Sequence, residues 1–315
     1  IVCKREGSSL KIIAESIMEH GSRSMIDGQV HDIEKVAQVV IKVKEELQRK
    51  VGFPLREVAI AAAGRTLKTV CVHVDQELDE ETEIDSDMVN GLELMGVNQA
   101  NKLVHADHSL QGESFYCVGY SVVTYYLNNY PITNLIEHSG KHIGADVLAT
   151  FLPYSVVNSL YKVLEKSDLV PISLTLEPIA ALEAIVPENI RLLNIALVDI
   201  GAGTSDIAIT RGGTITAYGM VSVAGDEITE AVAQKYLLDF NTAEMIKRKA
   251  AHKKKVSFKD ITGAKVSLQT EVLRAVIDEK ADMLASDFKG CASIERWLSK
   301  SFVLCRRRKH DAWIN

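Results

Sequence analysis

Residues 194–211 read N-I-A-L-V-D-I-G-A-G-T-S-D-I-A-I-T-R, in which two apolar runs rich in β-branched residues flank a polar turn. This pattern predicts two buried strands joined as a hairpin. Glycines in such a turn let the backbone approach a ligand closely, and N–H and hydroxyl groups there can face phosphate oxygens. The turn is therefore a candidate phosphate-binding site, made of Asp199, Gly201, Ala202, Gly203, Thr204, Ser205 and Asp206.

Asp199 lies at the end of the first of these strands, where it can hold a magnesium ion through water. A Gly-x-Gly pair alone is typical of ordinary hairpin turns. The complete string D-I-G-A-G-T-S-D between two apolar strands is far more specific. It resembles the second phosphate loop of the superfamily of ATPases that contains actin, sugar kinases and heat-shock chaperones.

Residues 176–184, L-E-P-I-A-A-L-E-A, resemble the first connecting helix of that superfamily. The resemblance implies that Glu177 has the catalytic role of polarising the attacking water. The segment alone favours a plainer interpretation, in which Pro178 occupies the first turn of a helix and Glu177 is a charge that suits the helix dipole.

Two later segments, V-A-G-D-E-I-T at 223–229 and N-T-A-E-M-I-K-R-K at 241–249, resemble only one branch of the superfamily. That branch is FtsA, the bacterial actin relative of cell division. The resemblance implies that Gly225 contacts phosphate and that Glu244 and Lys247 hold the ribose and the adenine edge. Ala202 and Ala224 stand where the family commonly has glycine, and a methyl group at either place narrows the room for phosphate.

Composition restricts the class of protein. A length of 315 residues suggests about two or three domains, and the formal charge of −6 gives no reason to expect nucleic acid as a partner. No apolar run is long enough to span a membrane. The five cysteines include no C-x-x-C pair, which favours reduced thiols in a cytosol over a disulfide frame or a zinc site.

The N-terminal third predicts strands and one long helix. Residues 1–4 and 10–14 suggest a hairpin that opens inside a strand, which predicts a missing N-terminus, and Asp32 is expected to cap a helix to about residue 49. Residues 58–63, which end before Gly64, and 66–74 are expected to form neighbouring strands. The acidic stretch 75–87 is expected to be a solvated boundary loop.

Residues 80–168 predict a small α+β domain, with a helix at 87–102, a strand pair at 115–126, a strand at 146–153 and a helix at 155–165. An insertion at this place is peculiar to FtsA among actin relatives. The expected domains are a first lobe of 1–79 and 169–193, the insertion at 80–168, an incomplete second lobe at 194–285 and an aberrant tail at 286–315.

Other polar groups carry weaker signals. His138 and His142 could share a helical face, and His105 and His108 flank Asp107, but no third ligand is placed by spacing, so surface histidines are expected. The basic stretch 247–255 could meet anionic lipid, but cations are common at a helix C-terminus and a solvated loop is expected.

In the C-terminal part, Asp226 is expected to cap a helix that runs to about residue 238, which places the Gly225 amide near a helix N-terminus, where phosphate is favoured. A helix starting at Thr242, a hairpin at 256–266 and a helix at 271–285 follow. The inward residues of the last helix are expected to be Val272, Ala275, Val276 and Leu284.

The tail at 286–315 loses this periodicity. Within codon degeneracy, residues 305–314 and 294–297 can be encoded so that one shifted frame reads V-G-G-G-S-M-T-P-G-L and L-N-G-G, which resemble the family's next motifs. This predicts a frameshift near 284–289, with Val198 and Ile200 on a partly uncovered sheet. The alternative is a divergent tail whose arginines are a solvated charge run.

Together the resemblance implies an α/β, actin-like ATPase (ribonuclease H-like) fold with an FtsA-type insertion. It implies ATP and Mg²⁺ as ligands, with Asp199 on the metal and Gly201, Ala202, Gly203 and Thr204 on the phosphates. It also implies filaments that link an FtsZ-like division protein to the cytoplasmic face of the membrane, with binding rather than turnover as the working event. The alternatives are a PilM-like pilus-assembly scaffold and a sugar-kinase or chaperone ATPase, for which no catalytic base and no peptide-binding domain are found.

Overall fold

The computed structural model describes residues 1–7, 9–21, 24–26, 28–62, 67–106, 113–260, 262–290 and 302–307. The chain forms two compact units. The first comprises Ile1–Lys68, Asn101–Gly119 and Thr150–Glu177, and the second Thr69–Ala100, Tyr120–Ala149 and Pro178–Asn315. No helix in the described ranges is long and apolar enough to cross a membrane.

The first unit contains the predicted N-terminal hairpin, in which β1 (Val2–Glu6) pairs antiparallel with β2 (Ser9–Ala14). Two short strands, β3 (Met25–Ile26) and β4 (Gln29–Val30), form a second hairpin. Helix α1 (Ile33–Val51) starts as predicted, because the Asp32 side chain accepts a hydrogen bond from the Lys35 N–H at 3.0 Å. It ends at Gly52, whose φ of 82° suits glycine.

Strand β5 (Glu57–Ala62) pairs in parallel with β10 (Val170–Leu176). Helix α3 (Tyr154–Lys166) packs its Val163 against Val36 and Ala37 of α1. This helix was expected in the insertion at 80–168, and the domain boundaries stay predictions. Gly64, expected at the end of β5, lies outside the described residues.

The neighbour expected for β5 was wrong. The segment predicted at 66–74 is part of a longer strand, β6 (Lys68–Glu83), which belongs to a different sheet of order β6-β9-β7-β8. The acidic stretch that was expected to be a loop continues this strand and then enters α2 (Ser86–Ala106). Up to Glu77 the carboxylates of this strand occupy alternate, exposed positions, and from Asp79 to Glu83 every residue is exposed, so the strand holds its acidic side chains in solvent and the acidic composition did not exclude it.

The same sheet corrects two further expectations. Strand β7 (Phe115–Leu127) is a single strand and not a pair, and β9 (Ser139–Pro153) begins earlier than expected. Strand β8 (Tyr130–Ile132) pairs with the end of β7. His142 lies in β9, so it shares no helical face with His138, and His108 lies outside the described residues.

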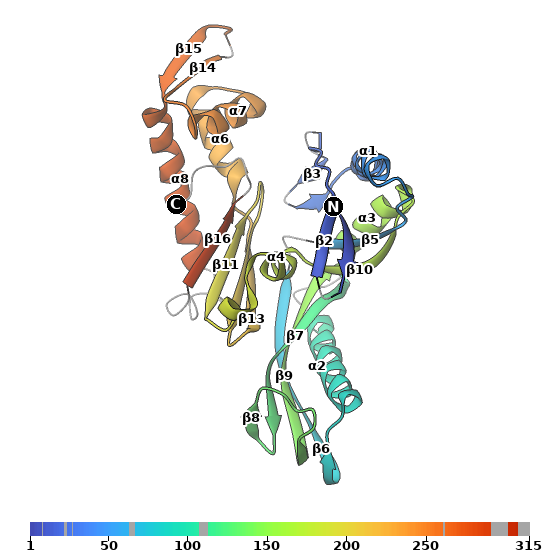
Figure 1. The fold of residues 1–315 in the computed structure, drawn as a ribbon. Helices are drawn as coiled ribbons and strands as arrows, with labels where there is room; N and C mark the ends of the chain where they lie inside the picture. Colours follow the sequence, from blue (N-terminus) through green and yellow to red (C-terminus); the bar gives the residue numbers. More distant parts are fainter. Residues whose placement is uncertain are drawn as a thin grey trace. The chain divides into compact units, whose positions relative to one another are not determined.

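In the second unit, α4 (Glu177–Ile185) and α5 (Glu188–Arg191) precede a four-stranded sheet of order β13-β12-β11-β16 (Figure 1). The predicted hairpin is confirmed as β11 (Ile195–Ile200) and β12 (Ser205–Arg211), followed by β13 (Thr214–Val221). Strand β16 (Phe302–Arg307) lies parallel to β11 over its whole length. Val198 and Ile200 were expected on a partly uncovered sheet, but both lie in a strand that is paired on both sides, and Val198 is buried.

Helices α6 (Gly225–Tyr236), α7 (Phe240–Ala250) and α8 (Thr270–Gly290) share a core with the hairpin of β14 (Lys255–Lys259) and β15 (Lys265–Gln269). The first residue of α6 is Gly225, so Ala224 and not Asp226 is its N-cap. In α8, Val272 and Ala275 are exposed, whereas Leu273, Val276 and Ile277 face the core. The side chain of Leu284 and residues 291–301 and 308–315 lie outside the description, so the frameshift stays a prediction.

Candidate functional site

The turn between β11 and β12 places two buried carboxylates opposite each other. The strand register pairs Asp199 with Asp206 and Ile200 with Ser205. Directly opposed residues of an antiparallel pair have their side chains on the same face, so the two aspartates share one face of the hairpin. They are only 8% and 6% exposed. The sequence placed Asp206 in the turn without a role, and the register is what pairs it with Asp199.

The turn closes with a hydrogen bond from the Gly201 N–H to the Thr204 carbonyl at 2.9 Å. Among the described residues, none accepts a backbone hydrogen bond from the N–H groups of Ala202, Gly203 or Thr204. Successive N–H groups in a turn are the donors that bind anions in nucleotide-binding loops. The tip of the hairpin therefore has the donors that a phosphate group needs.

The start of α6 lies against this turn. The Gly225 N–H donates to the Gly201 carbonyl at 3.2 Å, and the Asp226 N–H donates to the Ala202 carbonyl at 2.7 Å. The Ala224 N–H donates to the Glu227 carboxylate at 2.7 Å. The Gly225 amide that was expected to face phosphate is thus bonded to protein in this structure, and its contact with phosphate stays a prediction.

Gly225 is needed for close approach. A Cβ at this position would lie 3.2 Å from the Gly201 carbonyl oxygen and 3.5 Å from the Lys247 Nζ. The distance to Lys247 is an ordinary van der Waals contact, whereas the distance to the Gly201 carbonyl oxygen is tight, so a Cβ would require the backbone there to shift by a few tenths of an ångström and glycine suits the close approach of α6 to the turn.

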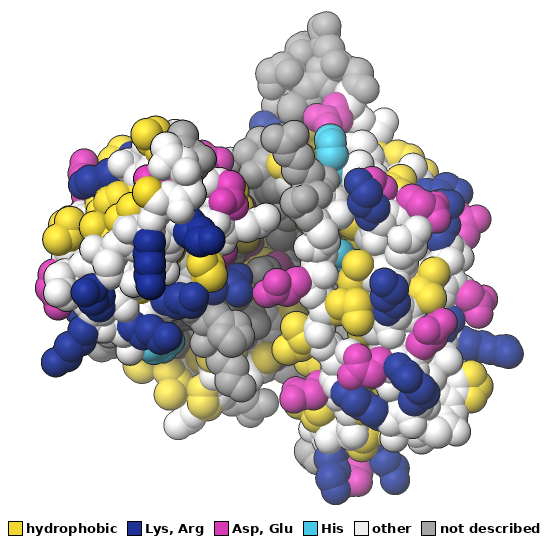
Figure 2. All heavy atoms as spheres, turned by 90° about the horizontal axis from the view of Figure 1, so that it is seen from above, with side chains coloured by type: hydrophobic (Ala, Val, Ile, Leu, Met, Phe, Trp, Pro, Cys, Tyr) yellow, Lys and Arg dark blue, Asp and Glu magenta, His cyan; other side chains and the backbone are white. Residues whose placement is uncertain are grey.

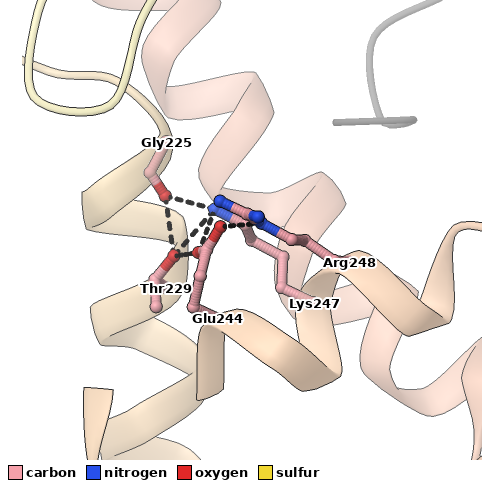
Figure 3. Close-up of polar contacts among 5 residues, drawn as sticks. All are labelled: Gly225, Thr229, Glu244, Lys247 and Arg248. Atoms are coloured by element: carbon pink, nitrogen blue, oxygen red, sulfur yellow. Dashed lines mark hydrogen bonds and ion pairs between the residues drawn. The ribbon is translucent and has the colours of Figure 1, made fainter. Parts of the chain in front are cut away.

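Lys247 points inward from α7 and is saturated with hydrogen bonds (Figure 3). Its ammonium donates to the Gly225 carbonyl at 2.9 Å and to the Thr229 hydroxyl at 2.7 Å, and it lies 2.7 Å from the Glu244 Oε2. These acceptors match the three N–H groups of a lysine. Its side chain is 3% exposed, so its predicted contact with a nucleotide stays untested.

Glu244 is held by groups on both sides. Its Oε2 also interacts with the Thr229 hydroxyl, and its Oε1 accepts from the Arg248 Nε at 2.8 Å. Burial alone raises the pKa of Glu244, but the hydrogen bonds from Lys247 and Thr229 and the positive charge of Lys247 lower it further than burial raises it. The carboxylate is therefore ionised and can accept additional hydrogen bonds from a ligand.

Asp199 and Asp206 fit only one mode of magnesium binding. In the described ranges no group of three or more His, Cys, Asp or Glu side chains is placed to hold a metal ion. Mg²⁺ commonly binds one or two carboxylates and takes its remaining ligands from water and from substrate phosphates. The pair of Asp199 and Asp206 fits this mode, in which the nucleotide supplies part of the coordination.

Sequence reasoning missed Thr229 and Arg248. Both positions carry a helical signal, because Thr229 is four residues after Gly225 and Arg248 is four residues after Glu244. Glu177 begins α4 and ends the other compact unit, so its catalytic role stays a prediction.

Comparisons with known proteins relate the chain to cell-division proteins. The family model "Cell division protein FtsA" matches residues 196–295. Curated proteins of the same name are 23% identical in Pseudomonas aeruginosa, over 72% of this chain and 52% of the relative, and 23% identical in Bacillus subtilis, over 80% and 55%. The chain spans about half the length of the curated relatives it matches.

A solved structure, "PilM-PilN type IV pilus biogenesis complex", superposes with a TM-score of 0.64 and 15% identity, over 96% of this chain and 77% of that one. This likeness shows the fold alone, which is the actin-like fold that the sequence predicted. Within this class, the family model and the curated relatives support an FtsA-type actin-like protein.

Proposed function

We propose that this chain binds a nucleoside triphosphate, ATP, as its Mg²⁺ complex at the turn between β11 and β12. The observation that carries the proposal is the run of N–H groups at Ala202, Gly203 and Thr204, which have no backbone acceptor among the described residues. They lie beside two buried carboxylates, Asp199 and Asp206, which can hold a hydrated magnesium ion. When bound, the ion neutralises charge on the phosphates.

In this proposal Glu244 accepts hydrogen bonds from the ribose hydroxyls. Its side chain is partly exposed and it is ionised because of Lys247 and Thr229. Lys247 then acts on Glu244 and does not itself reach the ligand.

An equilibrium titration with ATP tests the site. We expect Asp199→Asn to weaken ATP binding in the presence of Mg²⁺ by at least tenfold, because the variant loses a charge that holds the ion. Without Mg²⁺ the same variant should bind no worse than the wild type. Asp278→Asn, an exposed aspartate of α8, is the matched control and should change nothing. An unchanged affinity of Asp199→Asn for MgATP would refute the assignment.

We further propose that the protein acts in cell division, as a filament-forming link between an FtsZ-like protein and the cytoplasmic face of the membrane. The support is the match to the FtsA family over 196–295, which contains the hairpin, α6 and α7. Co-sedimentation with an FtsZ-like protein from the same genome, with and without lipid vesicles, tests it. Absence of an FtsZ-like protein from the pellet at saturating concentration contradicts this role.

A PilM-like scaffold is the second candidate, because the likeness to the PilM–PilN complex extends over 96% of this chain. The two roles differ in partner. Binding assays against an FtsZ-like protein and a PilN-like peptide from the same genome separate them, since each role predicts only one of the two complexes.

A further inference from the structure

Thr229 of α6 lies at the centre of the polar network in Figure 3 and is fully buried. Its hydroxyl is 3.0 Å from the Gly225 carbonyl oxygen, accepts a hydrogen bond from the Lys247 Nζ at 2.7 Å and contacts the Glu244 carboxylate. A side chain with no exposed surface cannot touch a ligand in this conformation. Any effect of Thr229 on binding must therefore pass through its neighbours.

Hydrogen bonds connect the neighbours of Thr229 to the hairpin turn. The Gly225 carbonyl accepts from Lys247, and the Gly225 N–H donates to the Gly201 carbonyl. The next N–H, that of Asp226, donates to the Ala202 carbonyl. An unbroken series of hydrogen bonds thus joins Thr229 to the turn whose amides carry the proposed phosphate site.

We propose that Thr229 is a positioning residue for phosphate binding. It holds the Lys247 ammonium against the Gly225 carbonyl, which fixes the first turn of α6 and, through it, the carbonyls of Gly201 and Ala202. The turn is then kept in one conformation before the ligand arrives, which lowers the entropic cost of binding. This inference rests on the proposed nucleotide site.

The geometry explains why a hydroxyl is required. The Thr229 oxygen accepts from Lys247 and has one hydrogen to donate, while Lys247 needs three acceptors and finds the third in this oxygen. Valine has a similar shape but offers neither a donor nor an acceptor. Thr229→Val therefore leaves one ammonium N–H without a partner in a buried place, and the network must rearrange.

Titration calorimetry with two probes tests the inference, namely MgATP and inorganic tripolyphosphate with Mg²⁺. We expect Thr229→Val to weaken both by about tenfold, the size that the loss of one buried hydrogen-bond partner implies. Thr229→Ser keeps the hydroxyl and should stay within about twofold of the wild type. Thr210→Val is the matched control, because Thr210 is equally buried, its hydroxyl bonds the Leu193 carbonyl and it lies at the far end of β12.

The outcomes distinguish a failure of the proposed nucleotide site from a failure of the positioning role of Thr229. If wild-type protein and every variant bind neither probe, the proposed site and this inference both fail. If the wild type binds tripolyphosphate and Thr229→Val binds it equally well, only the positioning role fails. This holds even when the variant binds MgATP more weakly than the wild type, because the substitution then acts through Glu244 alone. Should Thr229→Val not fold, Thr229→Ala is measured with the same probes and the same expected loss.

Discussion

In the described part of the chain, Lys247 lies beside one carboxylate and His73 lies between two, and these two basic side chains differ in their exposure to water. In the cluster of α6 and α7, the Lys247 side chain is 3% exposed. On the sheet that contains β6 and β9, His73 lies between Asp146, with Nδ1 to Oδ1 at 2.6 Å, and Asp75, with Nε2 to Oδ1 at 3.0 Å, and its side chain is 48% exposed. Basic and acidic side chains also alternate over much of the visible surface in Figure 2.

The difference in burial changes what each cluster does. Lys247 cannot exchange its partners for water, so it acts as a fixed structural link that is costly to break. His73 can be solvated, so its contacts contribute little by themselves but respond to pH. The hydrogen bond to Asp146 raises the pKa of His73 more than burial lowers it, and the hydrogen bond to Asp75 adds to the rise.

The first prediction breaks the buried cluster. We expect Lys247→Met to lower the free energy of unfolding by about 3 kcal/mol, because Glu244 and Thr229 lose a buried, charged partner. Urea denaturation measures it. Lys249→Met, two residues along the same helix, is the control and should change stability by less than about 0.5 kcal/mol. Equal effects of the two variants would show that Lys247 is no more important than a surface lysine.

The second prediction concerns the rim of the same cluster. Arg248 bonds the same carboxylate as Lys247, but its side chain is 43% exposed. We expect Arg248→Met to cost only about 0.5 kcal/mol, since water replaces much of what the guanidinium supplies. The same denaturation series measures it. A loss as large as that of Lys247→Met would mean that charge, and not burial, sets the strength of the network.

The third and smallest effect is the pH response of the exposed cluster. In the described part of the chain, His73 contacts Asp75 of β6, Asp146 of β9 and the ring of Tyr126 of β7. The Tyr126 hydroxyl donates to Asp146 at 2.8 Å, and His142 Nε2 lies 3.5 Å from Asp75 Oδ1. A raised pKa in the folded state means that this contribution to stability is complete below the ordinary histidine pKa of about 6.5. It is lost as the pH rises through the folded-state pKa.

We therefore expect the urea midpoint of the wild type to fall between pH 6 and pH 8.5 by more than that of His73→Gln. His105→Gln serves as the control, because the His105 Nδ1 is hydrogen-bonded to the Asn101 carbonyl of its own helix. The prediction is refuted if the urea midpoint of the wild type exceeds that of His73→Gln by an amount that grows as the pH rises.

Much of the local structure and part of the candidate site followed from sequence signals a few residues long. The hairpin of β11 and β12 was predicted from alternating apolar runs around glycines, and α1 from Asp32 at its start. The turn residues from Asp199 to Thr204 were identified in the same way. In each case the residues on which the prediction rests are the same residues that form the element.

The tertiary structure decided which strands pair and which charges are buried. The sequence predicted that β6 lies beside β5, yet β6 belongs to a sheet with β9. Strand β16 pairs with β11 although about 100 residues separate them along the chain. Lys247 lies three residues after Glu244 on α7 and starts a basic run, but only packing against α6 places it beside Thr229 and buries it. The hydrophobic period and turn chemistry are local properties, whereas strand partners and the burial of a charge depend on residues brought together only by folding.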